Sequence, residues 1–195
     1  MANCTTMDNL IRPFLEQYCH GMVLTTDTLS ELENHMTVVK YTKDKILLTE
    51  NQTHDYAYYI LQGAARSYYL KDGIEVNTWF AFEGEVIGSL HAYNNLPSRE
   101  TVELLEEATL VSVNLRTLKP FIHSNLQISN FIRTVIEEYA QFLEDRLFNS
   151  QFMSSMERYE LLLKHEPQAL QRVPLTYIAS YLGISRETLS RLRSK

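Results

Sequence analysis

The stretch that decides the fold is LTYIASYLGISRETLSRL, residues 175–192. Two short segments with helical spacing flank Gly183, a residue type that adopts the left-handed backbone of a tight turn without strain. Ser185 is a favourable N-cap for the second segment. The positions that hold two crossing helices together are small or apolar, namely Ile178, Ala179, Leu182, Ile184, Leu189 and Leu192. This pattern predicts a helix-turn-helix.

The outward face of the second predicted helix, residues 185–195, is polar and basic. Arginine pairs with the O6 and N7 atoms of guanine, and glutamate accepts from the N4 amine of cytosine. Serine and threonine donate to phosphates. We therefore expect this helix to read the major groove of double-stranded DNA through Ser185, Arg186, Glu187, Thr188, Ser190, Arg191 and Arg193. The alternative is a pair of surface helices with a glycine between them.

The charge of the chain is unevenly distributed. The 195 residues have a formal net charge of −6, which by itself argues against a non-specific nucleic-acid binder. Residues 1–155 contain 11 basic and 20 acidic residues, whereas residues 156–195 contain 7 basic and 4 acidic residues. Such an asymmetry points to one end that faces nucleic acid.

The composition of the chain changes in its middle part, from about residue 36 to residue 115. Short runs rich in β-branched and aromatic residues follow one another there, and an Asp72-Gly73 hairpin signal separates two of them. Many short strands at close spacing predict a small antiparallel roll. The runs are MTVVKY, KILL, YAYYILQ, AARSYYLK, IEVNTWFAF, VIGS and TLVSVN.

Helices are expected on both sides of this roll. Apolar spacing predicts helices over residues 7–20 and 27–34, with Pro13 in the first turn or at a break. A long amphipathic helix follows over residues 126–153, and another over residues 155–166. The long helix would span about 42 Å at about 1.5 Å per residue. Because that exceeds one face of so small a roll, its apolar stripe predicts a homodimer seam.

Taken together, these elements resemble the CRP/FNR family of bacterial transcription regulators. Residues 183–191 (GISRETLSR) are similar to the recognition helix of that family, and residues 59–63 (YILQG) and 82–88 (FEGEVIG) are similar to segments of its roll. The resemblance implies an α+β fold with an antiparallel β-roll of the double-stranded β-helix or jelly-roll type. It also implies that Arg186, Glu187 and Arg191 read bases.

The same resemblance implies a division of the chain and a set of partners. We expect a cyclic-nucleotide-binding-like sensor domain over residues 1–125, a dimerisation helix over 126–153 and a helix-turn-helix domain over 154–195. The expected partners are double-stranded DNA, a second copy of the chain, RNA polymerase and an unknown small-molecule effector. The usual β-hairpin wing after the recognition helix is not expected in this sequence, which ends at Lys195; either this branch of the family has no wing or the sequence is truncated.

The effector cassette departs from the family pattern. Ser89 stands where cyclic-nucleotide-binding members have the glutamate that accepts from the ribose hydroxyl. Ser98 stands in the place of the arginine that pairs with the cyclic phosphate, Arg99 comes one residue later, and Glu100 beside it would repel an anion. We therefore expect no cyclic AMP and no other cofactor. An effector pocket would involve Gly88, Ser89, Leu90, Ser98 and Arg99.

Other classes of function find little support in the sequence. The two cysteines cannot by themselves frame a four-cysteine metal or iron–sulfur site, and the six histidines lack metal-ligand spacing, although His91 lies near the cassette. Neither a membrane span nor a signal peptide is expected, and with only two cysteines we predict a reduced, cytoplasmic protein. The sequence shows neither a glycine-rich phosphate loop nor a nucleophile elbow, so we predict that the protein is not an enzyme. Two alternatives remain open: a ligand-binding roll whose C-terminal helices contact proteins, and a cupin-like metal enzyme.

Overall fold

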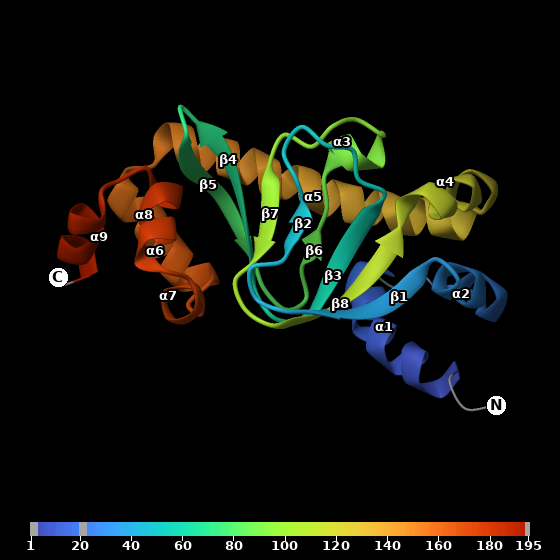
Figure 1. Cartoon of the computed structure of the whole chain (residues 1–195). Helices are drawn as coiled ribbons and strands as arrows, with labels where there is room; N and C mark the ends of the chain where they lie inside the picture. Colours follow the sequence, from blue (N-terminus) through green and yellow to red (C-terminus); the bar gives the residue numbers. More distant parts are fainter. Residues whose placement is uncertain (1–3, 20–22, 194–195) are drawn as a thin grey trace.

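The computed structural model describes residues 4–19 and 23–193, and its centre is a β-roll (Figure 1). In this part of the chain, eight strands form two four-stranded antiparallel sheets, with the orders β1-β8-β3-β6 and β2-β7-β4-β5. The strands are β1 (Met36–Tyr41), β2 (Ile46–Leu48), β3 (Tyr56–Gln62), β4 (Ala65–Lys71), β5 (Ile74–Ala81), β6 (Val86–Ile87), β7 (Thr101–Leu104) and β8 (Ala108–Asn114). The predicted antiparallel roll is confirmed.

The interior of the roll is filled by alternate residues of both sheets. Ile60 and Leu110 from one sheet pack against Leu48, Val102 and Leu104 from the other, and each of these side chains is at most 1% exposed. Residues two positions apart in a strand lie on the same face of the sheet. This alternation determines which side chains point into the roll. The short strand β7 was not among the predicted runs, although it supplies two of these residues.

The hairpin between β4 and β5 forms where the Asp-Gly signal predicts it. Asp72 and Gly73 both have positive φ angles, 53° and 79°, as a two-residue hairpin turn with the twist of the strands requires. Lys71 pairs with Ile74 across the turn. The tip of this hairpin is exposed.

Besides the long helix and the C-terminal helices, the described part of the chain has four helices around the roll. They are α1 (Cys4–Cys19), α2 (Thr26–Glu33), α3 (Leu90–Tyr93) and α4 (Leu115–Ser124). The predicted helices over 7–20 and 27–34 correspond to α1 and α2, except that His20 lies outside the described residues. The expectation for Pro13 was wrong. This residue lies inside α1, because the helix begins at Cys4 and the packing of Ile11 and Phe14 stabilises it across the proline.

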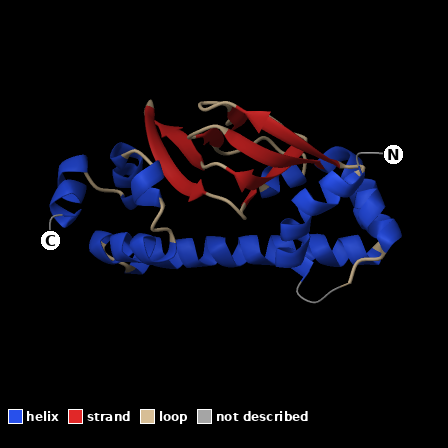
Figure 2. Cartoon of the chain, turned by 90° about the horizontal axis from the view of Figure 1, so that it is seen from below, coloured by secondary structure: helices blue, strands red, loops and turns tan. Residues whose placement is uncertain are grey.

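The long helix α5 (Leu126–Phe152) has 27 residues and confirms the predicted helix over 126–153 to within one residue. Figure 2 shows it running beneath the roll from the N-terminal helices to the C-terminal helices. Its first half is anchored, since Ile128 and Phe131 are fully buried and Phe131 meets the ring of Phe14 edge-on at 5.2 Å. Its second half leaves several apolar side chains exposed, namely Phe142, Leu143, Leu147, Phe148 and Phe152.

The C-terminal helices pack at one end of the roll. They are α6 (Ser155–His165), α7 (Ala169–Arg172), α8 (Leu175–Leu182) and α9 (Arg186–Arg193). A capping box at Ser154 and Glu157 begins α6, which confirms the predicted helix over 155–166 to within one residue. The core of these helices is continuous with the roll, because Ala64 and Phe82 belong to the same buried cluster as Ile178.

Candidate DNA-binding surface and effector pocket

The turn between α8 and α9 depends on Gly183. This residue ends α8 in the left-handed conformation, with φ 67° and ψ 32°. Its backbone N–H donates to the carbonyl of Ser180 at 3.1 Å, and the N–H of Ile184 donates to the carbonyl of Ala179 at 3.0 Å. A Cβ atom at Gly183 would meet no atom closer than 3.8 Å. The backbone conformation, and not a lack of space, therefore requires glycine here.

Helix α9 begins as the sequence predicts and exposes its polar face. The side chain of Ser185 accepts from the backbone N–H of Thr188 at 3.2 Å, which caps the helix. Leu189 is fully buried against α8. Five of the seven predicted DNA-reading residues lie on α9 with exposed side chains, namely Arg186, Glu187, Ser190, Arg191 and Arg193. Ser185 is exposed at the cap and Thr188 is half-buried.

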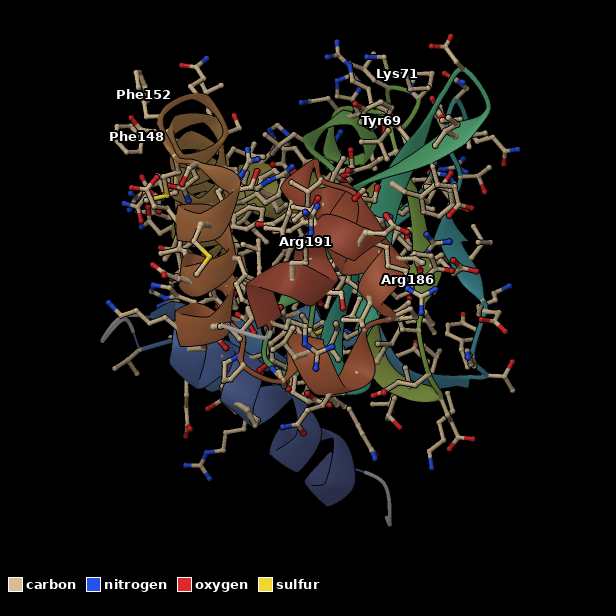
Figure 3. All side chains as sticks on the ribbon, turned by 90° about the vertical axis from the view of Figure 1, so that its left-hand side faces the viewer. Tyr69, Lys71, Phe148, Phe152, Arg186 and Arg191 are labelled. Carbon is tan, nitrogen blue, oxygen red and sulfur yellow. The ribbon has the colours of Figure 1, made fainter. Side chains whose placement is uncertain are left out.

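Figure 3 views the molecule from the end that carries α9, and Arg186 and Arg191 lie on this helix in front of the roll. The guanidinium of Arg191 donates to the Thr188 hydroxyl at 3.2 Å, so it is oriented along the helix. Hydrogen bonds from its own backbone amide and from Ser185 hold the pKa of the Glu187 carboxyl below its ordinary value. The exposed face therefore combines fixed positive charges with one ionised acceptor. Residues 194 and 195 of the predicted recognition helix lie outside the described residues.

Helix α8 docks on the edge of the sheet that contains β5. The hydroxyl of Ser180 accepts from the backbone N–H of Asn77 at 3.0 Å and donates to the backbone carbonyl of Glu75 at 3.1 Å. One side chain of α8 thus satisfies both a donor and an acceptor of the strand. The sequence pattern assigned Ser180 no role, because nothing local marks a serine as the partner of a strand more than a hundred positions away.

Arg66 of β4 makes the second contact between the roll and the C-terminal helices. Its guanidinium carbon lies 3.8 Å from the centre of the Tyr177 ring of α8 and 4.2 Å from that of Tyr68. It pairs with Glu75 and Glu103 at 2.6 Å each. A 3% exposed arginine with two carboxylate partners and two aromatic faces is held in one place.

Arg172 of α7 makes the third contact. It bridges Glu83, at 2.7 Å, and Glu106, both of which belong to the roll. The hydrogen bond from Arg172 lowers the pKa of Glu83 to about 2, which keeps this carboxylate ionised at neutral pH. We call these three residues the Arg172 bridge. Together with the contacts of Ser180 and Arg66, it fixes how the C-terminal helices sit on the roll.

An apolar cavity of about 300 Å³ lies between α1, α5 and the roll. Three of the five residues predicted for an effector pocket line it, namely Gly88, Ser89 and Leu90. Most of its wall is apolar, including Trp79 and Phe142. Its polar groups include Glu85, whose pKa is raised to about 7 by burial. The cavity suits a small, mainly apolar molecule.

The other two predicted pocket residues do not line the cavity. Ser98 is 1% exposed, and its hydroxyl donates to the backbone carbonyl of Glu100 at 2.7 Å. Arg99 is exposed and lies in a bend of the backbone just before β7. His91 has a structural contact: its Nδ1 lies 2.9 Å from the carbonyl of Pro97 and closes the loop after α3.

Metal-binding clusters and membrane-spanning helices are both absent from the described residues. Among residues 4–19 and 23–193, no group of histidine, cysteine, aspartate or glutamate side chains could hold a metal ion. Within the same ranges, no helix combines the length and the apolar character that a bilayer crossing demands.

Comparison with known proteins relates the roll to one family. Residues 38–125 match the cyclic nucleotide-binding domain. No curated protein matches the chain in sequence.

Solved structures resemble most of the chain. FixK2 from Bradyrhizobium japonicum superposes with a TM-score of 0.71 at 23% identity, covering 82% of this chain and 83% of FixK2. CLP from Xanthomonas campestris, described as a c-di-GMP responsive global regulator, has a TM-score of 0.68 at 16% identity and covers 87% of this chain and 90% of CLP. A CooA mutant from Carboxydothermus hydrogenoformans has a TM-score of 0.63 at 19% identity and covers 87% of this chain and 79% of CooA. Residues 38–125 thus have the fold of a cyclic nucleotide-binding domain, and most of the chain shares its overall fold with these proteins.

Proposed function

We propose that the protein is a homodimeric, sequence-specific DNA-binding transcriptional regulator of the CRP/FNR type. In this proposal α8 and α9 are the helix-turn-helix, and α9 enters the major groove. The observation that carries the proposal is the exposed basic face of α9, which follows a left-handed glycine turn and is backed by the buried Leu189. The likeness to CLP supports a regulatory role.

The second half of α5 supports the dimer. Leu143 and Leu147 are 37% and 58% exposed, and at helical spacing they share one face with Ile136 and Ala140. A repeat of three and four residues is what two helices need in order to pack along a shared seam. Two such chains would present two α9 helices to successive major grooves, about 34 Å apart on a roughly palindromic site.

The apolar cavity beside Gly88, Ser89 and Leu90 favours an uncharged small molecule over cyclic AMP or a cyclic dinucleotide. A contact with RNA polymerase belongs to the proposal through the family resemblance alone. We propose a role in binding and no enzymatic reaction.

A selection of bound genomic fragments tests the proposal, followed by gel shifts of Arg186→Ala and Arg191→Ala on the selected site. Each variant should lose about 1–3 kcal/mol of binding free energy and accept more bases at the contacted position, because each removes one bidentate base contact. Arg116→Ala is the matched control, since Arg116 is exposed on α4, near the opposite end of the molecule (Figure 1). Unchanged affinity and specificity in both α9 variants would refute the role of this helix.

The second candidate is a ligand-binding roll whose C-terminal helices contact other proteins. The extensive docking of α8 on the roll through Arg66 and Ser180 is the observation that favours it. Under this candidate the selection would recover no common sequence. Recovery of a palindromic motif would exclude it.

A further inference from the structure

A half-buried carboxylate lies at the edge of the roll's interior, close to the predicted effector cassette. It belongs to Glu100, which directly precedes β7, the strand whose Val102 and Leu104 fill the interior. Its carboxylate accepts three hydrogen bonds: from the Ser67 hydroxyl at 2.5 Å, from the Thr78 hydroxyl at 3.0 Å and from the indole N–H of Trp79 at 3.2 Å.

The three donors come from the neighbouring strands β4 and β5, and two of them are buried while Thr78 is half-buried. Ser67 of β4 is 0% exposed and Trp79 of β5 is 6% exposed. Buried donors that lack an acceptor each cost about 1–3 kcal/mol, so this arrangement requires an acceptor at the point where they converge. Several neutral donors that converge on one point form a site for an anion. In this chain, Glu100 supplies the anion.

We propose that Glu100 is a built-in anionic ligand of the roll, and that its carboxylate fills a subsite for a small carboxylate or phosphate group. This inference rests on the proposed function only in its consequence for regulation, because the subsite itself does not depend on DNA. It follows that the roll rejects anionic effectors, cyclic nucleotides included. Trp79 lines the apolar cavity and donates to Glu100, whereas Glu100 itself does not line the cavity, which stays available to an uncharged molecule.

The same carboxylate connects the interior of the roll to its helices. Burial and the negative charge of Glu100 raise the pKa of Tyr139 on α5 to about 12, which places the two groups within electrostatic reach of each other. Ser67 is the neighbour of Arg66, whose side chain turns to the other face and holds Tyr177 of α8. A permanently filled subsite thus holds the strands on which the C-terminal helices dock.

Chemical rescue of a Glu100→Ala variant tests the subsite without DNA. We expect this variant to melt at a lower temperature than the wild type, and sodium formate at tenfold its Kd to raise its Tm by about 3–6 °C relative to sodium chloride at equal ionic strength. The wild type should not respond. Glu107→Ala is the matched control, since Glu107 is an exposed glutamate on the turn between β7 and β8.

A second variant and a calorimetric titration also test the subsite. Glu100→Gln keeps the volume and an acceptor oxygen, so it should fold, melt between the wild type and Glu100→Ala, and show no response to formate. Wild-type protein titrated calorimetrically with inorganic phosphate and with cyclic AMP should give no binding heat. Micromolar binding of either by the wild type, or a Glu100→Ala variant that formate does not stabilise, would overturn the built-in ligand. Loss of DNA binding in the gel shifts above would leave these results intact, so the two proposals fail separately.

Discussion

At the scale of single residues, Gly183 is required for the conformation of its backbone, which has a φ angle of 67°. A residue with a Cβ in the left-handed conformation costs about 1–2 kcal/mol. The space around Gly183 is open to 3.8 Å, so this conformational cost is the main effect of adding a methyl group. The glycine therefore sets the angle between α8 and α9 and contributes little to packing.

We expect Gly183→Ala to lower the free energy of unfolding by about 1–2 kcal/mol for this reason. Gly88→Ala is the control, because Gly88 has no positive φ and a Cβ there would lie 3.5 Å from Ala57, an ordinary contact. Urea unfolding followed by circular dichroism measures both. Equal losses in the two variants would contradict the conformational explanation.

The positions of residues that follow a local sequence pattern could be predicted, whereas the contacts of residues whose partners are distant in the sequence could not. The exposed positions of Arg186 and Arg191 follow from helical spacing around Leu189, although their role in DNA reading stays a prediction. The roles of Arg66 and Ser180 could not be predicted from the sequence, because only the fold brings their partners near them. Glu100 was noticed as a charge that would repel an anion, but its three donors became visible only in the folded roll.

At the scale of elements, α5 divides into two halves with different environments. The first half is fixed to α1 and the roll, and the second half projects an apolar face that nothing in the described chain covers. In Figure 3, Phe148 and Phe152 point away from the roll at the C-terminal end of this helix, which faces the viewer. The centres of their rings lie 4.9 Å apart, and the two rings form a second exposed apolar surface in addition to that of Leu143 and Leu147.

We expect Leu147→Glu to weaken the proposed dimer and to raise its dissociation constant at least about 100-fold. In the proposed dimer Leu147 would be buried at the two-fold seam. The substitution would remove this leucine from both copies and place two like charges close together. Gln141→Glu introduces the same charge on another face of α5 and serves as the control. Sedimentation equilibrium measures the constant. If the two variants dimerise equally well, the seam lies elsewhere.

Spacing and composition made most elements predictable, whereas β7 and α4 were missed. The long helix and seven strand runs follow from spacing and composition alone. Strand β7 contains Glu103 and lies among further glutamates, a residue type that is depleted in strands, and α4 contains Pro120. Both form because their neighbours favour them: β7 pairs with β2 and β4, and Leu118 of α4 is fully buried.

At the scale of the whole molecule, the Arg172 bridge ties the C-terminal helices to the roll and makes their attachment sensitive to acid. The pKa of Glu83 is lowered from 4.5 to about 2, chiefly by the hydrogen bond from Arg172. A carboxyl with a lowered pKa contributes stability that is complete above its unfolded value and disappears as pH falls through the folded value. The bridge therefore weakens between about pH 4.5 and pH 2.

Arg172→Ala should remove this contribution. We expect the variant to be less stable than the wild type at pH 7, with a difference that shrinks as pH falls from 4.5 towards 2. Hydrogen exchange should also become faster at the amides of α8. Arg12→Ala removes an exposed ion pair with Glu16 on α1 and should change neither observable. A stability difference that does not vary with pH would argue against the bridge.

The contact between α8 and β5 has one more consequence, which concerns solubility. Strand β5 is the last strand of its sheet, and the free edge of a sheet is a template for pairing with the strands of other molecules. Ser180 occupies the backbone groups of Asn77 and Glu75 at that edge. The helices that we propose to read DNA therefore also protect the sheet against edge-to-edge aggregation, and a roll separated from them would expose a strand that can associate with another copy.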